Sequence, residues 1–341
     1  MFPDKPSANE PKGKSRVTIY DVAHAAGLSH ATVSRHLNGG KDVSPAARTA
    51  IERAITETGF VPNHHARRLA GGRSKVVALF HCVDNSKFFT DPNINHLMLD
   101  CNRVFSDHGI MTVIPVTSNG PARAATRHLA SRIVDPAVLF CAPSDSQAVA
   151  DLIKRRLPLV ACGTPIGHEH DVSYVTTDDR LGAREMVAYL RRRRRRIAMI
   201  AGPADLPGGI QRLAGYQDVI GVQDPALVVH GDFSYDGGLL ATAELLRRAP
   251  DLDAIFVASD LMARGALAAL QQAGRRVPDD VAVAGFDDSP AATHTHPRLT
   301  TVRIPWRRYP YELVQQLLRR MYGDGPSSVT MPVELVIRES A

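Results

Sequence analysis

Short apolar runs and amphipathic stretches alternate along the chain after residue 75. The apolar runs are three to six residues long and lie at 76–80, 111–116, 137–141, 159–161, 197–201, 227–229, 254–258 and 281–284. Continuous apolar strands separated by helices predict a parallel sheet that is buried on both faces. About 265 residues exceed what one such layer needs, so we expect an α/β body with two lobes.

The first 75 residues have a different pattern, with three short helical stretches between residues 18 and 59. Thr18 is a candidate N-cap, and apolar residues then recur at helical spacing at Ile19, Val22, Ala23 and Ala26. Gly27 ends this helix, and Ser29 caps a second helix over 31–37. Ser44 caps a third, which ends at Gly59.

The spacing of Ala23, Gly27 and Val33 is typical of a helix-turn-helix, with a small residue, a turn glycine and an apolar residue that packs back on the first helix. The second helix of such a motif lies in the major groove of DNA, with its N-terminal side chains at the base edges. On this chain those side chains belong to His30, Ala31 and Arg35.

These three side chains suit different base contacts. His30 can donate or accept a hydrogen bond, and Ala31 can contact a thymine methyl group. Arg35 has the planar fork that pairs with guanine O6 and N7. Candidates for phosphate contacts are Thr18, Tyr20, Ser29, Thr32, Ser34 and Asn38. Ser29 and Thr32 could instead serve only the helix itself, as cap and surface residue.

The excess of positive charge is confined to one end of the chain. The formal net charge is +6, from 41 Lys and Arg against 35 Asp and Glu. Residues 1–75 hold 12 basic and 6 acidic residues, whereas residues 76–341 hold 29 of each. A basic module on a neutral body fits a polyanion-binding head, although a basic tail for solubility gives the same composition.

Residues 1–16 are polar and rich in proline, so we expect a disordered tail and not a secretory signal. There is no apolar run of about 18 residues, and we expect a cytoplasmic protein without a membrane segment. The four cysteines show no CxxC or metal-ligand spacing, so we expect reduced core thiols and no metal or other cofactor.

The N-terminal region resembles the DNA-binding head of the LacI/GalR family of bacterial transcription regulators. The resemblance is carried by VTIYDVAHAAGLSHATVSRHLN at 17–38, followed by GFVPN at 59–63 and ARRLAGG at 66–72. The resemblance implies a helix-turn-helix domain over 17–62 and a hinge helix with linker over 63–74. In that family the hinge helix pairs with its partner-chain copy in the minor groove. Asn63, Arg67 and Leu69 are then DNA-binding residues, with Leu69 as the wedge between base steps. One departure is His36, where the family usually has an aliphatic core residue.

The resemblance extends through 75–341, most clearly in FVASDLMARGALAALQQAG, and implies a two-lobed periplasmic-binding-protein-like body for effector binding and dimerisation. Ligands bind α/β sheets at the carboxyl ends of the strands. That rule selects Phe88, Phe89, Asp260 and Asp287, and the family pattern adds Arg212 and Phe233. Aromatic, guanidinium and carboxylate groups suit a small polar ring, such as a sugar or a nucleobase.

Four of the six effector residues also have a plainer interpretation. Asp260 could cap the helix that begins at Leu261, and Asp287 could form a helix cap or an interlobe salt bridge. Phe88 and Phe89 could be core residues. The six arginines at 191–196 lie between a helix and a strand, and we expect an exposed helix end, with an extra phosphate contact as the alternative.

The sequence therefore predicts a ligand-responsive transcriptional regulator, by family default a repressor. A recognition helix reads only a half-site, so we expect a homodimer on a palindromic operator. A P-loop, a GxGxxG after a strand and a GxSxG are all absent, and we expect no catalytic residues. The alternative is a solute-binding protein of the periplasmic type without DNA function.

Overall fold

The computed structural model describes residues 17–37, 42–60, 76–82, 91–115, 136–144, 146–221 and 224–341. The chain divides into two compact units, Met1–Ser74 and Lys75–Ala341. Each unit has its own apolar core.

The first unit is built from three helices, α1 (Ile19–Ala26), α2 (His30–Leu37) and α3 (Pro45–Thr58). Their apolar faces meet around the fully buried Val22, Val33 and Ile51. A helix of eight residues is too short to be stable alone, so this shared core holds α1 and α2 in place.

The ends of these helices follow the predicted capping residues. The Thr18 backbone N–H donates to the Asp21 carboxylate (2.7 Å), and Ser44 Oγ accepts from the Ala47 N–H (3.3 Å). Gly27 and Gly59 end α1 and α3 in the left-handed region, each with φ of 65°. A residue without Cβ adopts that conformation at little cost, which allows the tight corner between α1 and α2.

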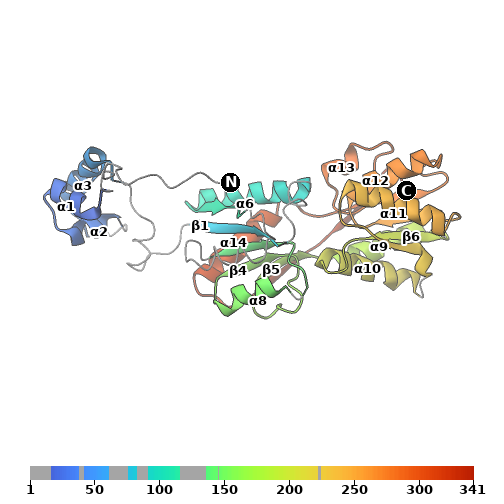
Figure 1. Ribbon diagram of the computed structural model, residues 1–341, viewed down its shortest axis with the longest axis horizontal. Coiled ribbons are helices and arrows are strands. Elements are labelled where there is room, and N and C mark those ends of the chain that lie inside the picture. The colour runs from blue at the N-terminus through green and yellow to red at the C-terminus, as the bar shows by residue number, and fades with distance from the viewer. Residues whose placement is uncertain are drawn as a thin grey trace, which may run out of the picture. The chain divides into compact units, whose positions relative to one another are not determined.

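The first lobe of the second unit is a six-stranded parallel sheet in the order β11-β5-β4-β3-β1-β2. Its strands are β1 (Val76–His81), β2 (Met111–Val113), β3 (Ala137–Phe140), β4 (Leu159–Cys162), β5 (Ser173–Thr177) and β11 (Ser328–Met331). Helices α6 (Pro92–Asp107) and α14 (Tyr309–Met321) cover one face, and α8 (Gln147–Lys154) covers the other (Figure 1).

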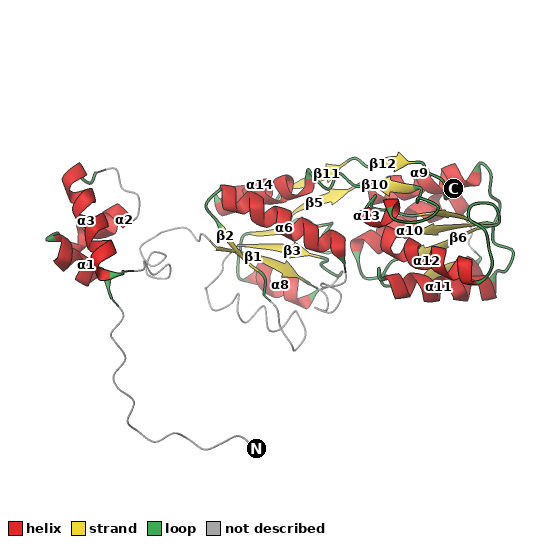
Figure 2. Ribbon diagram, turned by 90° about the horizontal axis from the view of Figure 1, so that it is seen from above, coloured by secondary structure: helices red, strands yellow, loops and turns green. Residues whose placement is uncertain are grey.

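The second lobe has a four-stranded parallel sheet in the order β7-β6-β8-β9. Its strands are β6 (Ile197–Ala201), β7 (Val228–His230), β8 (Ala254–Val257) and β9 (Ala282–Ala284). Around them lie α9 (Asp179–Arg191), α10 (Pro207–Ile220), η1 (Pro225–Leu227), α11 (Tyr235–Arg248), α12 (Asp260–Gln272) and α13 (Pro290–Thr293). Helices α9 and α10 pack together, as do α11 and α12, and Figure 2 shows this second lobe beside the first.

The chain crosses between the lobes three times. It crosses after β5, between β10 (Thr301–Arg303) and α14, and between β11 and β12 (Glu334–Val336). Strands β10 and β12 form an antiparallel pair, in which Val302 lies opposite Leu335. The expected α/β class with two parallel sheets is therefore confirmed, and the eight predicted strands all exist with slightly shifted ends.

Strands β5, β10, β11 and β12 were not predicted. Strand β5 has the sequence SYVTT and alternates buried and half-buried residues, so it lacks the continuous apolar run of the other strands. Its last two residues, Thr176 and Thr177, line a cavity. In the described ranges, none of the helices has the length and apolar character needed to span a bilayer.

Candidate functional site

One face of α2 is exposed and carries the three residues predicted to contact bases. His30, Ala31 and Arg35 are exposed, whereas Val33 on the opposite face is fully buried in the three-helix core. Arg35 has no ion-pair partner among the residues that the structure describes. Its guanidinium is therefore available to an external acceptor.

The first residue of this face is oriented by an aromatic contact. The rings of Tyr20 and His30 are stacked with centroids 4.7 Å apart and planes 13° apart. Tyr20 remains 67% exposed, so the stack lies on the surface of the unit. It links α1 to the start of α2 and restricts the rotamers of His30 before any partner is bound.

The polar residues around α2 combine local and external roles. Ser29 Oγ accepts from the Thr32 N–H (3.2 Å) and bonds to the Thr32 hydroxyl (2.8 Å), so Ser29 does cap α2. Thr18 and Ser29 are exposed, while Thr32 and Ser34 are half-buried. His36 is half-buried against α3, with Nε2 3.9 Å from the Glu52 carboxylate, which gives its ring a polar partner.

Several predicted residues lie outside the described residues. They are Asn38, Asn63, Arg67 and Leu69 of the DNA-binding set, and Phe88 and Phe89 of the effector set. The tail over 1–16 and the hinge over 63–74 also lie outside, so their roles stay predictions.

A cavity of about 400 Å³ lies between the two lobes of the second unit. It is bounded by the carboxyl ends of β3, β4 and β5 in the first lobe and by α10 and the segment around Asp287 in the second. Its lining combines apolar and aromatic groups, among them Phe233, Trp306 and Tyr309, with hydroxyls and carboxylates. The volume and lining are typical of a small-molecule site.

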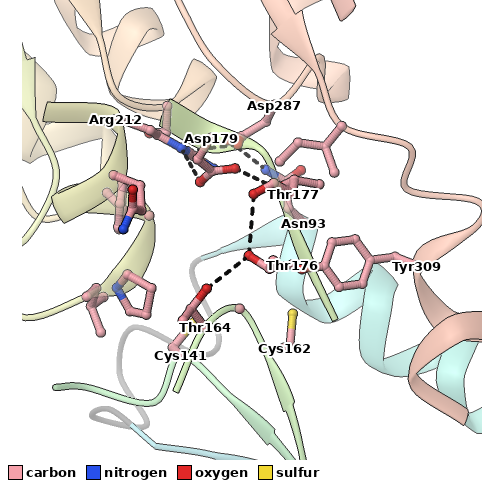
Figure 3. Close-up of a pocket in the computed structure, with 18 of the residues that line it drawn as sticks. Asn93, Cys141, Cys162, Thr164, Thr176, Thr177, Asp179, Arg212, Asp287 and Tyr309 are labelled. Atoms are coloured by element: carbon pink, nitrogen blue, oxygen red, sulfur yellow. Dashed lines mark hydrogen bonds and ion pairs between the residues drawn. The ribbon is translucent and has the colours of Figure 1, made fainter. Parts of the chain in front are cut away.

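Polar side chains connect the two lobes along one wall of this cavity (Figure 3). Thr164 donates to Thr176 (3.4 Å), and the Thr177 hydroxyl donates to Asp179. On the second lobe Asp179 and Asp287 flank Arg212, and Asn93 Nδ2 of α6 reaches Asp287 Oδ2 at 3.4 Å. The last contact joins the lobes directly.

Arg212 is the centre of this polar wall. Its Nε donates to Asp179 (2.9 Å), and its Nη1 donates to Asp287 (3.1 Å) and to the Ala258 carbonyl (2.6 Å). The guanidinium carbon lies 3.8 Å from the centroid of the Phe286 ring. Because Nε and Nη1 donate to two carboxylates and a carbonyl, only Nη2 is left without an acceptor among the described residues.

Burial and neighbouring charges shift the pKa values of these groups. Burial raises the pKa of Asp287 well above its ordinary value, since the attraction of Arg212 only partly offsets burial and the nearby Asp260, Asp91 and Asp179 add to the rise. Burial also raises the pKa of Asp91, although the backbone N–H groups of Asn93 and Ile94 lower it. Burial by itself lowers the pKa of Arg212, but Asp179 and Asp287 raise it by more.

Three of the six predicted effector residues line the cavity, namely Arg212, Phe233 and Asp287. Asp260 does not belong to the lining. It is fully buried, accepts from the Ser289 N–H (2.8 Å) and the Thr301 hydroxyl (2.6 Å), and so holds the segment beside Asp287 in place. The N-cap of α12 is Ser259, whose hydroxyl accepts from the Met262 N–H (3.3 Å).

Sequence reasoning missed most of the first-lobe wall. Asp91 and Asn93 begin α6, and Thr176 and Thr177 end the unpredicted β5. The Asp91-Pro92 pair is a recognisable helix start and could have marked this position. Trp306, the only tryptophan of the chain, also lines the cavity and donates through Nε1 to the Asp287 carbonyl (2.8 Å).

Backbone strain also concentrates at this cavity. Cys141, Phe233 and Asp287 have φ values of 52°, 67° and 115°, in the region that non-glycine residues rarely adopt. Such conformations persist where the surroundings impose them, commonly at ligand sites.

The cysteines are reduced thiols, with Cys82 and Cys101 buried and Cys141 and Cys162 at the cavity. Burial raises the pKa of the Cys162 thiol to about 12, so this thiol is protonated and poorly nucleophilic at neutral pH. Within the described ranges no group of three or more His, Cys, Asp or Glu side chains could hold a metal ion.

Comparison with known proteins gives consistent matches for both units. A family model described as bacterial regulatory proteins, lacI family, matches residues 18–63, and one described as a periplasmic binding protein-like domain matches 187–341. The HTH-type transcriptional regulator CelR of Thermobifida fusca is 40% identical over 336 residues, which is 96% of this chain and 99% of CelR. The HTH-type transcriptional repressor CytR of Escherichia coli is 29% identical over 96% of this chain and 97% of CytR.

Solved structures of regulators are similar to this chain over nearly its whole length. A CelR–cellobiose complex superposes with a TM-score of 0.74 at 38% identity, over 96% of this chain and all of that chain. The lac repressor dimer bound to operator and the anti-inducer ONPF superposes with a TM-score of 0.80 at 26% identity, over 96% of this chain and 99% of that one.

Proposed function

The chain belongs to the LacI family of bacterial regulatory proteins, and from this premise we propose that it is a homodimeric repressor whose operator affinity is set by a small uncharged sugar. The observation that carries the DNA-binding part is the exposed face of α2, where His30, Ala31 and Arg35 project from a capped three-helix core. An Arg paired with guanine contributes about 1–3 kcal/mol of base discrimination.

We infer a two-fold operator because α2 has only eight residues and can read only half of a typical site. A candidate surface for the second copy lies at the edge strand β2 of the first lobe. Leu99 of α6 is 57% exposed, and Met111 and Ile114 at β2 are 61% and 43% exposed. Apolar side chains of this size that share one edge are typical of an interface.

The effector class follows from the charge of the cavity. Four carboxylates line it against two guanidiniums, and Arg212 is already paired with two of the carboxylates. A phosphorylated ligand would meet repulsion there, whereas hydroxyl groups would find carboxylate and threonine oxygens as acceptors. Trp306, Phe233 and Tyr309 offer apolar surface for a sugar ring. The cellobiose in the CelR complex supports a sugar of this kind.

Coupling to DNA requires that the ligand distinguish two arrangements of the lobes. Asn93 and Asp287 touch across the cavity at 3.4 Å, so a bound ring competes for the contact that joins the lobes. A coupling free energy of about 1–3 kcal/mol is typical for such regulators.

The test is a gel shift with duplexes from the region upstream of the chain's own gene, with a scrambled duplex of equal length as control. We expect a discrete complex that cellobiose or another neutral sugar weakens, and no effect of glucose 6-phosphate. If no upstream duplex is retained at low salt, the operator assignment is wrong. If only the phosphorylated sugar acts, the charge argument is wrong.

A further inference from the structure

The amino edge of the second-lobe sheet carries an unusual concentration of arginine. In a parallel sheet all helix-to-strand connections lie at the amino ends of the strands, opposite the carboxyl ends where the ligand cavity lies. Here those connections are 191–196, 221–227, 249–253 and 273–281. We call them, with the last turn of α11 from residue 244, the amino edge.

Three of the six consecutive arginines are used by the fold. Arg191 donates to the Val219 carbonyl at the end of α10, and Arg194 Nη2 donates to the Pro278 carbonyl (2.6 Å). Arg196 forms ion pairs with Asp224 and Asp251. These three side chains tie neighbouring connections of the amino edge together.

The other three arginines have no such role. The side chains of Arg192, Arg193 and Arg195 are exposed and make no ion pair or hydrogen bond with any residue in the described part of the chain. Their backbone is nevertheless fixed. The N–H groups of Arg192 and Arg193 donate to the Tyr189 and Leu190 carbonyls at 3.2 and 3.1 Å, and the Arg195 N–H donates to the Asp253 carboxylate at 2.7 Å. The turn therefore holds three unpaired cations close together on a rigid support.

The charge of the amino edge is not balanced locally. It holds ten arginines and six carboxylates, a net charge of +4, although residues 76–341 as a whole are neutral. The arginines other than 191–196 are Arg247, Arg248, Arg275 and Arg276, and the acids are Asp224, Glu244, Asp251, Asp253, Asp279 and Asp280. Like charges this close repel one another, and a polyanion would relieve that repulsion.

We propose that the amino edge is a second, sequence-independent DNA-binding surface, which contacts the phosphate backbone through Arg192, Arg193 and Arg195. Guanidinium groups pair with phosphate oxygens in two-pronged geometry, and binding gains from the release of condensed counterions. Through this surface one regulator holds a duplex segment other than the one bound by its α2.

The composition of the amino edge favours nucleic acid over an acidic protein. Protein interfaces need a buried apolar or aromatic anchor at their centre. The exposed large apolar residues in the described ranges are Tyr20, Leu99, Met111, Ile114, Leu240, Tyr311, Tyr322 and Ile337, and none lies in the amino edge. A phosphate backbone needs no such anchor, because exposed cations suffice.

The test is hydrogen exchange by mass spectrometry on the full chain with a random 30-base-pair duplex. At a duplex concentration ten times the dissociation constant, exchange in peptides covering 191–196 should slow about tenfold, and the effect should disappear as salt is raised. Unchanged exchange at low salt overturns the proposal.

Two triple variants separate this surface from indirect effects of α2. Arg192→Gln/Arg193→Gln/Arg195→Gln should abolish the slowing. Lys154→Gln/Arg155→Gln/Arg156→Gln removes three consecutive exposed cations at the corresponding helix-to-strand connection of the first lobe and should preserve it. If the arginine variant keeps the protection, the effect comes from DNA bound elsewhere and the proposal is wrong.

A second experiment measures whether one protein assembly can bind two DNA duplexes at the same time. Wild-type protein held on an immobilised duplex should capture a second, labelled duplex, and the Arg192/Arg193/Arg195 variant should capture at least tenfold less. If both proteins capture the second duplex equally, the two duplexes are held by α2 helices of a higher oligomer and not by the amino edge, and the proposal is overturned.

Discussion

The ion pairs of Arg212 lead to a quantitative prediction about the stability of the second unit. Arg212→Met keeps most of the side-chain volume but leaves Asp179 and Asp287 without their cation, and both carboxylates are at most 10% exposed. Removing one partner of a buried ion pair costs about 3–5 kcal/mol, because the remaining charge is uncompensated. At about 2–4 °C per kcal/mol, Tm of this unit should fall by about 6–20 °C.

Trp306 makes the assay specific to this unit. It is the only tryptophan of the chain and lies at the cavity, so its fluorescence reports unfolding of the second unit and not of the three-helix unit. This matters because two independent units need not unfold in one transition.

The uncompensated carboxylates of Arg212→Met should also make the stability of this variant depend on pH. Without Arg212 the pKa of Asp287 in the folded state, already raised by burial, should rise further, and the folded state then binds more protons than the unfolded state. Stability then falls as pH rises, so the deficit of the variant should shrink between pH 8 and pH 5. Adding Asp179→Asn and Asp287→Asn should restore much of the loss at pH 8. A change in Tm below about 2 °C, or a deficit that is independent of pH, would show that Arg212 does not compensate buried charge on Asp179 and Asp287.

Three further predictions concern other parts of the chain. Arg35→Ala should weaken specific operator binding by about 1–3 kcal/mol but leave binding to random DNA nearly intact, as titrated gel shifts would reveal; an unchanged footprint contradicts the recognition role of α2. Burial raises the pKa of Asp260 to about 7, so this group's contribution to stability is lost as pH rises from about 4 through 7. Asp260→Asn can accept from the Ser289 N–H through Oδ1 and donate to the Thr301 hydroxyl through Nδ2, so it should flatten the fall in Tm between about pH 5 and pH 7. An equal fall in both proteins would contradict this prediction. Leu99→Asp should weaken self-association by at least tenfold in sedimentation experiments, and Leu240→Asp, at another exposed leucine, is the matched control. Equal dimerisation of wild type and Leu99→Asp would show that the interface lies elsewhere.

The sequence was sufficient for those elements whose signals are local. Caps and apolar spacing predicted the three helices of the first unit, because Thr18, Ser29 and Ser44 act on backbone groups within four residues. The apolar runs predicted the buried strands for a similar reason. A strand that is buried on both faces is apolar at every position, whichever helices cover it, so its signal lies within its own sequence.

The cavity wall could be predicted only in part. Arg212 and Asp287 are 75 residues apart, and Asn93 meets Asp287 across 194 residues, so their contacts depend on how the lobes pack. Strand β5 escaped prediction because four of its five residues carry hydroxyl groups, two of which, on Thr176 and Thr177, line the cavity. The role of Asp260 depends on Ser289 and Thr301, which lie 29 and 41 residues further along the chain.

The cation-centred triad has a consequence for how ligand choice could be altered. Asp179, Arg212 and Asp287 all belong to the second lobe, and their ion pairs with one another form within that lobe, so this part of the binding surface is organised in advance. Substitutions among the hydroxyl groups of the opposite lobe, at Thr164 and Thr176, would change the pattern presented to a sugar without removing a hydrogen bond to either buried carboxylate. Changes of ligand specificity should therefore cost least stability when the substitutions are made on that side of the cavity.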